Sequence, residues 1–296
     1  MKLGDYLSKG VLRLFGEWMP KLHYLPEKSL ITANGGKMLV YPKKGGVHSD
    51  LFLNRIREPC ATSYLLSSDF LKKREVTLDI GANIGYYALL ELMIVGTEGF
   101  VYAIEPVDEN YGLLTLNLKL NGATNFECFQ YLIGERRQLS AIYVADHRNL
   151  SSIDPKAILE SGRRIIKKES RTMLSVDDFS DMISRRIDFV RMDVEGYEYQ
   201  ILKGMQKTLT AGSPSVMVEL HPHILGWKRI NKFLAVFEEN GYTVPFAVWE
   251  RKKLGGRLVQ KLSGLPALGH NLSYSLLKEG IKQKYGWCPN VFFSID

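Results

Sequence analysis

The chain has 296 residues, of which 45% are hydrophobic and 24% are charged, and its formal net charge is +7. This composition is ordinary for a globular protein with a substantial core, and it excludes a disordered or fibrous chain. The length suits one large domain or a domain with an extension. The positive charge is compatible with an anionic partner or a membrane surface but requires neither.

The three cysteines, Cys60, Cys128 and Cys288, lie far apart, and none belongs to a C-x-x-C pair. The sequence therefore predicts neither a disulfide framework nor a zinc site, and a reducing compartment fits best. No apolar run approaches ~18 residues, so no membrane-spanning helix is expected. The N-terminus lacks the apolar core and cleavage site of a signal peptide, so we expect a cytoplasmic protein.

The first 70 residues are predicted to form an extension that covers the functional site. Apolar residues recur at helical spacing over residues 1–20, with basic residues among them. Such a helix suits packing on the body or on a second subunit, or peripheral contact with the inner face of a membrane. A small hairpin is expected around residues 38–41, and one helix over residues 50–71. Residues 71–296 are expected to form the catalytic domain.

An apolar run at residues 76–80 is followed by Gly81 and Gly85 and then by an apolar segment from Tyr86 to Leu92. This order indicates a strand, a glycine turn and a helix, which form the first unit of an open α/β sheet. Ligands of such sheets bind beyond the carboxyl ends of the strands, so residues 79–85 should face the ligand.

The glycine spacing narrows the identity of that ligand. A dinucleotide fingerprint is G-x-G-x-x-G, but here Asn83 replaces the middle glycine, and no phosphate loop of the G-x-x-x-x-G-K-[ST] type is present. Asp79, just before the turn, would repel a phosphate and suit a positive charge. Glu105, after a second strand expected at residues 100–104, can accept hydrogen bonds from both ribose hydroxyls. Together these features predict S-adenosylmethionine, a sulfonium nucleoside without a phosphate.

The rest of the chain alternates strands and helices, which gives about seven strands with flanking helices in an α/β fold. Further strands are expected at residues 126–129, 187–193, 215–221, 242–249 and 290–294, with an extra strand at 138–145. Further helices are expected at residues 110–120, 197–209 and 230–240, with a short one after residues 175–179. Residues 151–170 are predicted to be a mobile polar insertion, and their basic clusters resemble solvated surface.

Three acids, Asp193, Glu195 and Glu198, follow the strand expected at residues 187–193. Acids at a strand end are costly unless they face water, a cation or a substrate. Asp193 is expected at the cofactor-facing rim. The two glutamates lie near a helix N-terminus, where the macrodipole favours negative charge. They either cap that helix alone or, with Asp193, orient or deprotonate an acceptor.

Glu219 and His221 end the next strand and share one of its sides by alternation. An imidazole beside acids can take a proton near neutral pH, although a buried structural histidine is equally compatible with the pattern. The same side chains are compatible with a divalent metal. No ligand spacing requires a metal, so no metal ligand is assigned.

Several stretches together resemble the FkbM family of S-adenosylmethionine-dependent methyltransferases. They are residues 78–87 (LDIGANIGYY), 101–106 (VYAIEP), 117–121 (NLKLN), 187–198 (IDFVRMDVEGYE), 201–204 (ILKG) and 218–221 (VELH). The resemblance covers about residues 50–220, and Arg191 stands where the family pattern often has lysine. It implies a class I methyltransferase fold, a Rossmann-like sheet whose last strand is antiparallel. It also implies O-methylation, commonly of sugar hydroxyls in glycans, glycolipids or natural products.

The residues and the resemblance together assign two sets of site residues. The cofactor site comprises Asp79, Gly81, Ala82, Asn83, Gly85, Tyr86, Glu105, Pro106, Asn110, Tyr131 and Asp193. The catalytic set comprises His221 as general base, Asp193 as its orienting partner, and Glu195 and Glu198 as positions that face the acceptor.

We expect a small-molecule or glycan acceptor. An RNA methyltransferase, suggested by the net charge, is one alternative, but no RNA-binding module accompanies the core, so a nucleic-acid partner is disfavoured. A nicotinamide-dependent oxidoreductase shares the strand, glycine turn and ribose acid. A non-catalytic binding protein on the same scaffold is a third alternative. The sequence does not indicate the oligomeric state.

Overall fold

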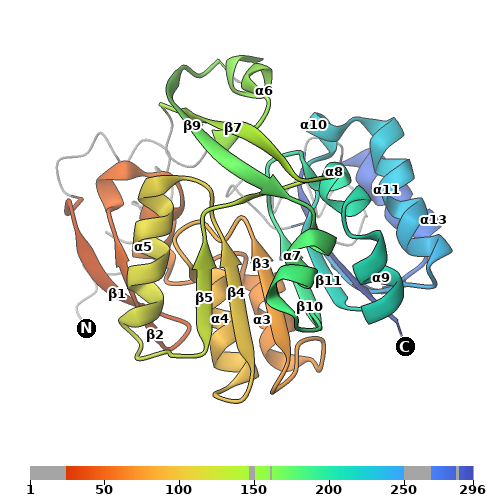
Figure 1. Cartoon of the computed structure of the whole chain (residues 1–296), viewed down its shortest axis with the longest axis horizontal. Helices are drawn as coiled ribbons and strands as arrows, with labels where there is room; N and C mark the ends of the chain where they lie inside the picture. Colours follow the sequence, from red (N-terminus) through yellow and green to blue (C-terminus); the bar gives the residue numbers. More distant parts are fainter. Residues whose placement is uncertain (1–24, 147–150, 161, 250–267, 285–286, 296) are drawn as a thin grey trace, which may run out of the picture.

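The computed structural model describes residues 25–146, 151–160, 162–249, 268–284 and 287–295 (Figure 1). The helix expected over residues 1–20 lies outside these ranges. The centre of the molecule is an eight-stranded sheet in the order β13-β12-β14-β11-β10-β3-β4-β5. Its strands are β3 (Val76–Ile80), β4 (Phe100–Ile104), β5 (Phe126–Phe129), β10 (Phe189–Met192), β11 (Ser215–Glu219), β12 (Thr243–Trp249), β13 (Leu268–Leu272) and β14 (Pro289–Ser294).

The directions of the strands confirm the predicted fold class. Strands β5, β4, β3, β10 and β11 are mutually parallel, whereas β14 is antiparallel to both of its neighbours. The last strand of the chain is therefore reversed relative to the parallel strands beside it, as a class I methyltransferase sheet requires. The prediction counted about seven strands and missed β13, which pairs with β12 at the edge of the sheet.

Helices cover both faces of the sheet because successive residues of its strands point to opposite sides. On β4, Tyr102 and Ile104 belong to one apolar cluster, and Val101 and Ala103 belong to the other. One face is covered by α4 (Tyr86–Val95) and α5 (Asp108–Lys119). The other face is covered by α7 (Val176–Ile183), α8 (Glu198–Lys203), α9 (Gln206–Gly212), α10 (Pro222–Leu225), α11 (Trp227–Glu239) and α13 (Tyr274–Gln283). The single helix expected over residues 197–209 is thus two helices, which Gly204 separates.

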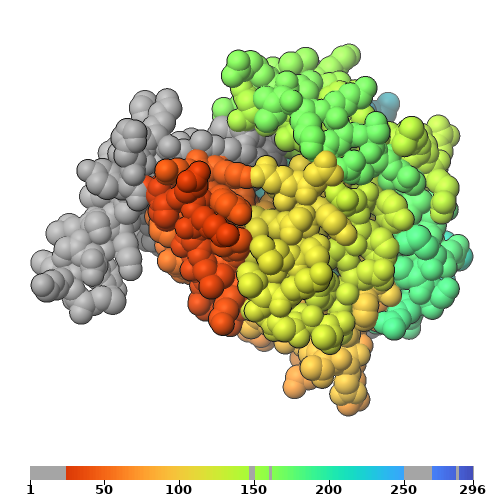
Figure 2. Space-filling model, turned by 60° about the vertical axis from the view of Figure 1, so that its left-hand side comes forward, coloured from red at the N-terminus to blue at the C-terminus, as the bar shows by residue number. Residues whose placement is uncertain are grey.

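The N-terminal segment packs into the same core as α4 and α5. It contains β1 (Ser29–Ala33), β2 (Gly36–Val40), η2 (Pro42–Lys44), α2 (Gly46–Asn54) and α3 (Pro59–Ser67). The buried Asn117 on α5 accepts a hydrogen bond from Leu39 N at 2.7 Å, which fixes the hairpin against that helix. Figure 2 shows the hairpin lying directly on α5.

The single helix expected over residues 50–71 is wrong. Arg55 and Glu58 adopt left-handed conformations with φ of 62° and 42°, and Pro59 then begins α3. Proline has no amide hydrogen to continue a preceding helix, but it fits well at the first position of a new one. The break turns Arg57 and Glu58 toward the body of the protein, where Glu58 is buried.

A second sheet lies over the carboxyl ends of the central strands (Figure 1). Its order is β6-β9-β7-β8, with β6 (Leu132–Ile133), β7 (Gln138–Ala145), β8 (Ser151–Ser152) and β9 (Ile165–Leu174). The extra strand expected at residues 138–145 is therefore present. The region predicted to be a mobile insertion instead contains β8, α6 (Pro155–Glu160) and much of β9. Within the described ranges, no helix combines the length and apolarity needed to cross a membrane.

Candidate active site

The structure brings together the glycine turn after β3 and the acidic stretch after β10. The two strands are parallel neighbours, and Asp193 N donates to Ile80 O at 3.1 Å. Gly81 has a φ of +81°, and a Cβ atom there would lie 2.1 Å from the carbonyl oxygen of Asp193. Only glycine combines this backbone conformation with so close an approach. The two motifs recognised in the sequence therefore form one edge of one site.

Glu105 lies at the end of β4, beside the glycine turn. Its carboxylate accepts hydrogen bonds from Asn83 N at 2.9 Å, from Val107 N at 3.0 Å and from Asn110 Nδ2 at 3.4 Å. The side chain is only 4% exposed, and burial raises the pKa of Glu105 to about 7. Among the described residues, the amide oxygen Oδ1 of Asn83 is buried with no hydrogen-bond partner. The strand end thus offers acceptors of the kind that ribose hydroxyls require.

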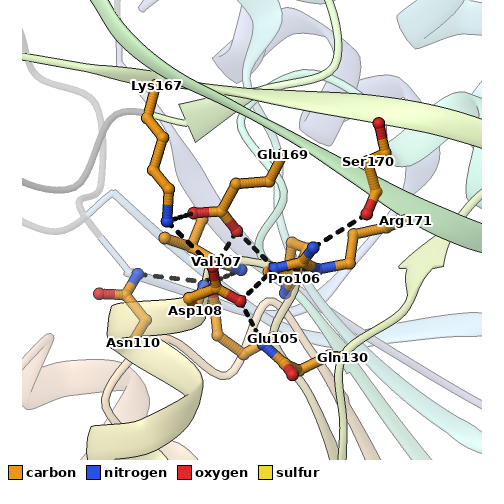
Figure 3. Close-up of polar contacts among 10 residues, drawn as sticks. All are labelled: Glu105, Pro106, Val107, Asp108, Asn110, Gln130, Lys167, Glu169, Ser170 and Arg171. Atoms are coloured by element: carbon orange, nitrogen blue, oxygen red, sulfur yellow. Dashed lines mark hydrogen bonds and ion pairs between the residues drawn. The ribbon is translucent and has the colours of Figure 1, made fainter.

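A network between β9 and the start of α5 supports Glu105, and sequence reasoning missed it (Figure 3). Arg171 Nε donates to the carbonyl oxygen of Pro106 at 2.7 Å, and its Nη2 contacts both Asp108 and Glu169. Glu169 is buried and accepts a hydrogen bond from Asp108 N at 3.1 Å. The second sheet therefore supplies an acidic cap to the amino end of α5, where the helix dipole favours negative charge. The sequence signal nearest to this network was the basic cluster of Arg163, Arg164, Lys167 and Lys168, which resembles solvated surface.

Asp79 does not face the ligand in the way the sequence predicted. Its side chain is fully buried, and Oδ1 accepts a hydrogen bond from Arg191 Nη1 at 2.9 Å. Arg191 also donates to Asp193 at 3.1 Å, and its guanidinium lies 3.9 Å from the centre of the Tyr87 ring. The negative charge of Asp79 is therefore balanced by Arg191, within the protein. Its role in the site is to hold Arg191 and, through it, Asp193.

The N-terminal segment joins this buried network through Glu58. Tyr87 Oη donates to Glu58 at 2.6 Å, Asn290 Nδ2 donates at 3.3 Å, and Arg57 pairs with it at 2.8 Å. Burial alone would raise the pKa of Glu58, but Arg57 and Arg191 outweigh it, so this pKa lies below its ordinary value. The ionised carboxylate therefore ties the segment before β3 to α4 and β14, next to the acidic stretch.

His221 sits between two glutamates just after β11. Its Nδ1 is 2.6 Å from Glu198 Oε1, and its Nε2 is 3.3 Å from Glu195 Oε2. The imidazole is 2% exposed, and Glu198 is fully buried. Burial by itself lowers the pKa of His221, but the carboxylates of Glu195 and Glu198 outweigh it, so this pKa lies well above its ordinary value. An ionised carboxylate can only accept, so we assign the Nδ1 hydrogen to the contact with Glu198.

The carboxylate in contact with Nδ1 of His221 belongs to Glu198, whereas the sequence led us to expect Asp193 as the partner of this imidazole. Glu198 is held in place because its Oε1 also accepts a hydrogen bond from Gly196 N at 3.0 Å. Asp193 instead pairs with Arg191, although its carboxylate, that of Glu195 and a ring nitrogen of His221 all lie within 4.8 Å of one another. The four residues assigned to catalysis are therefore neighbours, although Asp193 pairs with Arg191 and Glu198 contacts His221.

The remaining residues assigned to the cofactor site lie around the same strand ends. Ala82 N donates to Ile104 O at 3.0 Å, which fixes the turn against β4. Gly85 has a φ of +91° and begins α4. The hydroxyl of Tyr86 instead contacts the N-terminal segment, 3.2 Å from Thr62 Oγ1. Tyr131 stacks on Phe129 at the end of β5, with ring centres 5.6 Å apart.

Comparison with known proteins identifies the family. The model of the FkbM methyltransferase domain matches residues 79–244, which is more than half of the chain. The chain belongs to this family. The FkbM cofactor is S-adenosylmethionine, as the sequence predicted, and the nicotinamide alternative is set aside. The buried oxygen of Asn83 beside the Glu105 carboxylate fits the ribose of this nucleoside.

Two curated relatives and one solved structure illustrate these similarities. A hexuronic acid methyltransferase, AglP, from Haloferax volcanii is 27% identical over 50% of this chain and 56% of its own length. A protein-L-isoaspartate O-methyltransferase from Thermosipho melanesiensis is 36% identical over 20% of this chain and 29% of its own length. The match therefore spans about half or less of each curated relative. A crystal structure of an FkbM methyltransferase from Methylobacillus flagellatus aligns with a TM-score of 0.37 at 19% identity, over 55% of this chain and 37% of that one.

Proposed function

We propose that this FkbM methyltransferase transfers a methyl group to a hydroxyl, and that the hydroxyl belongs to a sugar of a glycan, glycolipid or natural product. The observation that carries the proposal is the buried contact of 2.6 Å between Glu198 and His221, next to the strand ends that bear the cofactor motifs. A sugar acceptor is supported by the curated relative named as a hexuronic acid methyltransferase.

His221 is the general base in this proposal. A sugar hydroxyl is a poor nucleophile at neutral pH, so its proton must leave as the new oxygen–carbon bond forms. S-adenosylmethionine, when bound, supplies an electrophilic methyl group on its sulfonium. Glu198 holds the Nδ1 hydrogen, so Nε2 takes the hydroxyl proton in the enzyme molecules whose imidazole is neutral. Because the pKa of His221 is raised, that neutral fraction grows as the pH rises. Glu195, 3.3 Å from Nε2, lies on the side from which the hydroxyl approaches.

Asp193 and Arg191 contribute positioning rather than proton transfer. Their hydrogen bond of 3.1 Å fixes the strand end that separates the glycine turn from His221. Much of the rate enhancement in methyl transfer comes from keeping the oxygen, the methyl carbon and the sulfur in line. A rigid, buried ion-pair network below the acceptor suits that requirement, because small displacements of either reactant slow the reaction.

The test is methyl transfer from isotopically labelled S-adenosylmethionine to a panel of glycans, glycolipids, hydroxylated metabolites and RNA. The proposal predicts label in a sugar-containing acceptor, attached to oxygen when the product is analysed by fragmentation mass spectrometry. Label found only in RNA, or attached to nitrogen or carbon, would refute it. Parallel reactions with chelator determine whether transfer needs a divalent metal.

A further inference from the structure

Cys288 is the third cysteine of the chain, and the fold places it against the proposed base. Strand β11 pairs with β14 in an antiparallel register that sets Glu219 opposite Asn290. The pairing continues beyond the strands, because Leu220 N donates to Pro289 O at 2.9 Å. One step farther, Cys288 lies opposite His221, and the Cys288 sulfur lies within 4.8 Å of a ring nitrogen of His221. A thiol, an imidazole and a carboxylate thus converge from two strands that are distant in sequence.

The donor atoms of these side chains are close enough to share one metal ion. One ligand atom each from Glu219, His221 and Cys288 lies within 4.8 Å of the others. Zinc bonds to sulfur, nitrogen and oxygen donors at about 2.0–2.3 Å, so the donors of a formed tetrahedral site lie roughly 3.3–3.8 Å apart. A contraction of the donor separations by at most about 1.5 Å would close the site around an ion. Three mixed donors with one open position are typical of zinc sites that are accessible to other ligands.

The surroundings of His221 already match those of a metal ligand. A histidine that binds a metal through one ring nitrogen usually donates the other N–H to a carboxylate, which fixes the ring. Glu198 provides that partner at 2.6 Å from Nδ1 and is fully buried, which leaves Nε2 as the donor atom. Carboxylate oxygens of Asp193 and Glu195 also lie within 4.8 Å of a ring nitrogen of His221, and their charge favours a dication.

We propose that Glu219, His221 and Cys288 form a binding site for Zn²⁺, and that the bound ion blocks methyl transfer by occupying Nε2 of His221. The binding claim depends only on these three side chains. The blocking claim rests on the proposed function of His221 as base. Sequence spacing gave no sign of the site, because 66 residues separate His221 from Cys288 and no short ligand motif links them.

Cobalt substitution tests the binding claim without any methyl-transfer assay. Metal-stripped full-length protein is titrated with Co²⁺, and the absorption spectrum is followed for the thiolate-to-cobalt charge-transfer band. We expect the band in the wild type and in Cys128→Ser, the matched control on β5, and its loss in Cys288→Ser. A wild-type spectrum without the band, or a band that persists in Cys288→Ser, overturns the site.

Wild-type protein alone supplies a second measurement, which does not depend on the folding of a variant. Zn²⁺ should protect Cys288 from alkylation by iodoacetamide, as read by peptide mass spectrometry, and leave Cys128 unprotected. Glu198→Gln should weaken the affinity for Zn²⁺ by about 10- to 100-fold, because it removes the partner of the imidazole. Equal alkylation of Cys288 with and without Zn²⁺ contradicts the proposal.

The blocking claim is tested once an acceptor has been found. Zn²⁺ should abolish methyl transfer by the wild type, and chelator should restore it, whereas Cys288→Ser should keep its own zinc-free rate when Zn²⁺ is added. An unchanged or increased wild-type rate with Zn²⁺ bound refutes the blocking claim. If no acceptor is methylated, the proposed function fails, but the cobalt and alkylation results still decide whether the site exists.

Discussion

The affinity for the cofactor should depend on pH through Glu105. This carboxyl is 4% exposed, and burial raises its pKa to about 7. Ribose hydroxyls donate to an ionised carboxylate, so the bound cofactor favours the charged form. Binding should therefore be at full strength above pH 7 and should weaken as the pH falls through that value.

The magnitude follows from the fraction of Glu105 that is ionised. With a pKa of about 7, that fraction falls from about 90% at pH 8 to about 10% at pH 6. The dissociation constant should then rise about tenfold, which corresponds to about 1.4 kcal/mol. S-adenosylhomocysteine is a suitable ligand, because its own groups keep nearly constant charge over this range.

Isothermal titration calorimetry at pH 6, 7 and 8 measures this dependence directly. Glu105→Gln is the matched control, because it keeps the size of the side chain but cannot ionise. We expect weaker binding by the variant and no slope with pH. A wild-type affinity that is flat over this range, or a slope that survives in Glu105→Gln, would refute the assignment of Glu105 to the ribose.

Three further predictions follow from the site and its supports. Arg171→Ala frees the loop after β4 and should raise KM for S-adenosylmethionine several-fold with little change in kcat. Arg164→Ala, which removes an exposed side chain paired with Asp146 just before β9, should leave KM unchanged, and a fall in kcat alone for Arg171→Ala would contradict the prediction. Glu195→Gln removes a carboxylate that raises the pKa of His221, so the rising limb of the pH–kcat profile should move to lower pH. If the limb stays at the same pH, His221 is not the titrating base. Gly81→Ala should lower the free energy of unfolding by about 2–5 kcal/mol in urea denaturation, because its Cβ would lie 2.1 Å from a backbone oxygen at a positive φ. Gly112→Ala on α5 is the control: a Cβ there has nothing within 4 Å, so this substitution should be neutral or stabilising.

The sequence predicted the sheet well because its strands are short apolar runs between turn residues. It also predicted that Gly81 and Glu105 lie at one edge of the sheet, since each follows such a run. The sequence could not show which charged side chains pair with one another. Arg191 lies 112 residues from Asp79, and only the parallel register of β3 and β10 shows that they meet.

Local sequence also misjudged residues whose role depends on distant partners. The basic cluster of Arg163, Arg164, Lys167 and Lys168 resembled solvated surface because Asp108, which Lys167 contacts, lies on another element. The sequence favoured Asp193 as the partner of His221, but the turn at Gly196 places the carboxylate of Glu198 against the imidazole. Side-chain pairing across the fold, rather than the type of residue, decides these roles.

The most direct test of the central claim is single-turnover methyl transfer by His221→Gln, with an acceptor identified from the panel and with cofactor saturation verified by calorimetry. Loss of a general base should slow transfer by about 10²- to 10⁴-fold while cofactor affinity stays within about twofold of the wild type. His223→Gln, at the neighbouring exposed histidine, should transfer at the wild-type rate. A His221→Gln enzyme that transfers methyl groups as fast as the wild type would contradict the account.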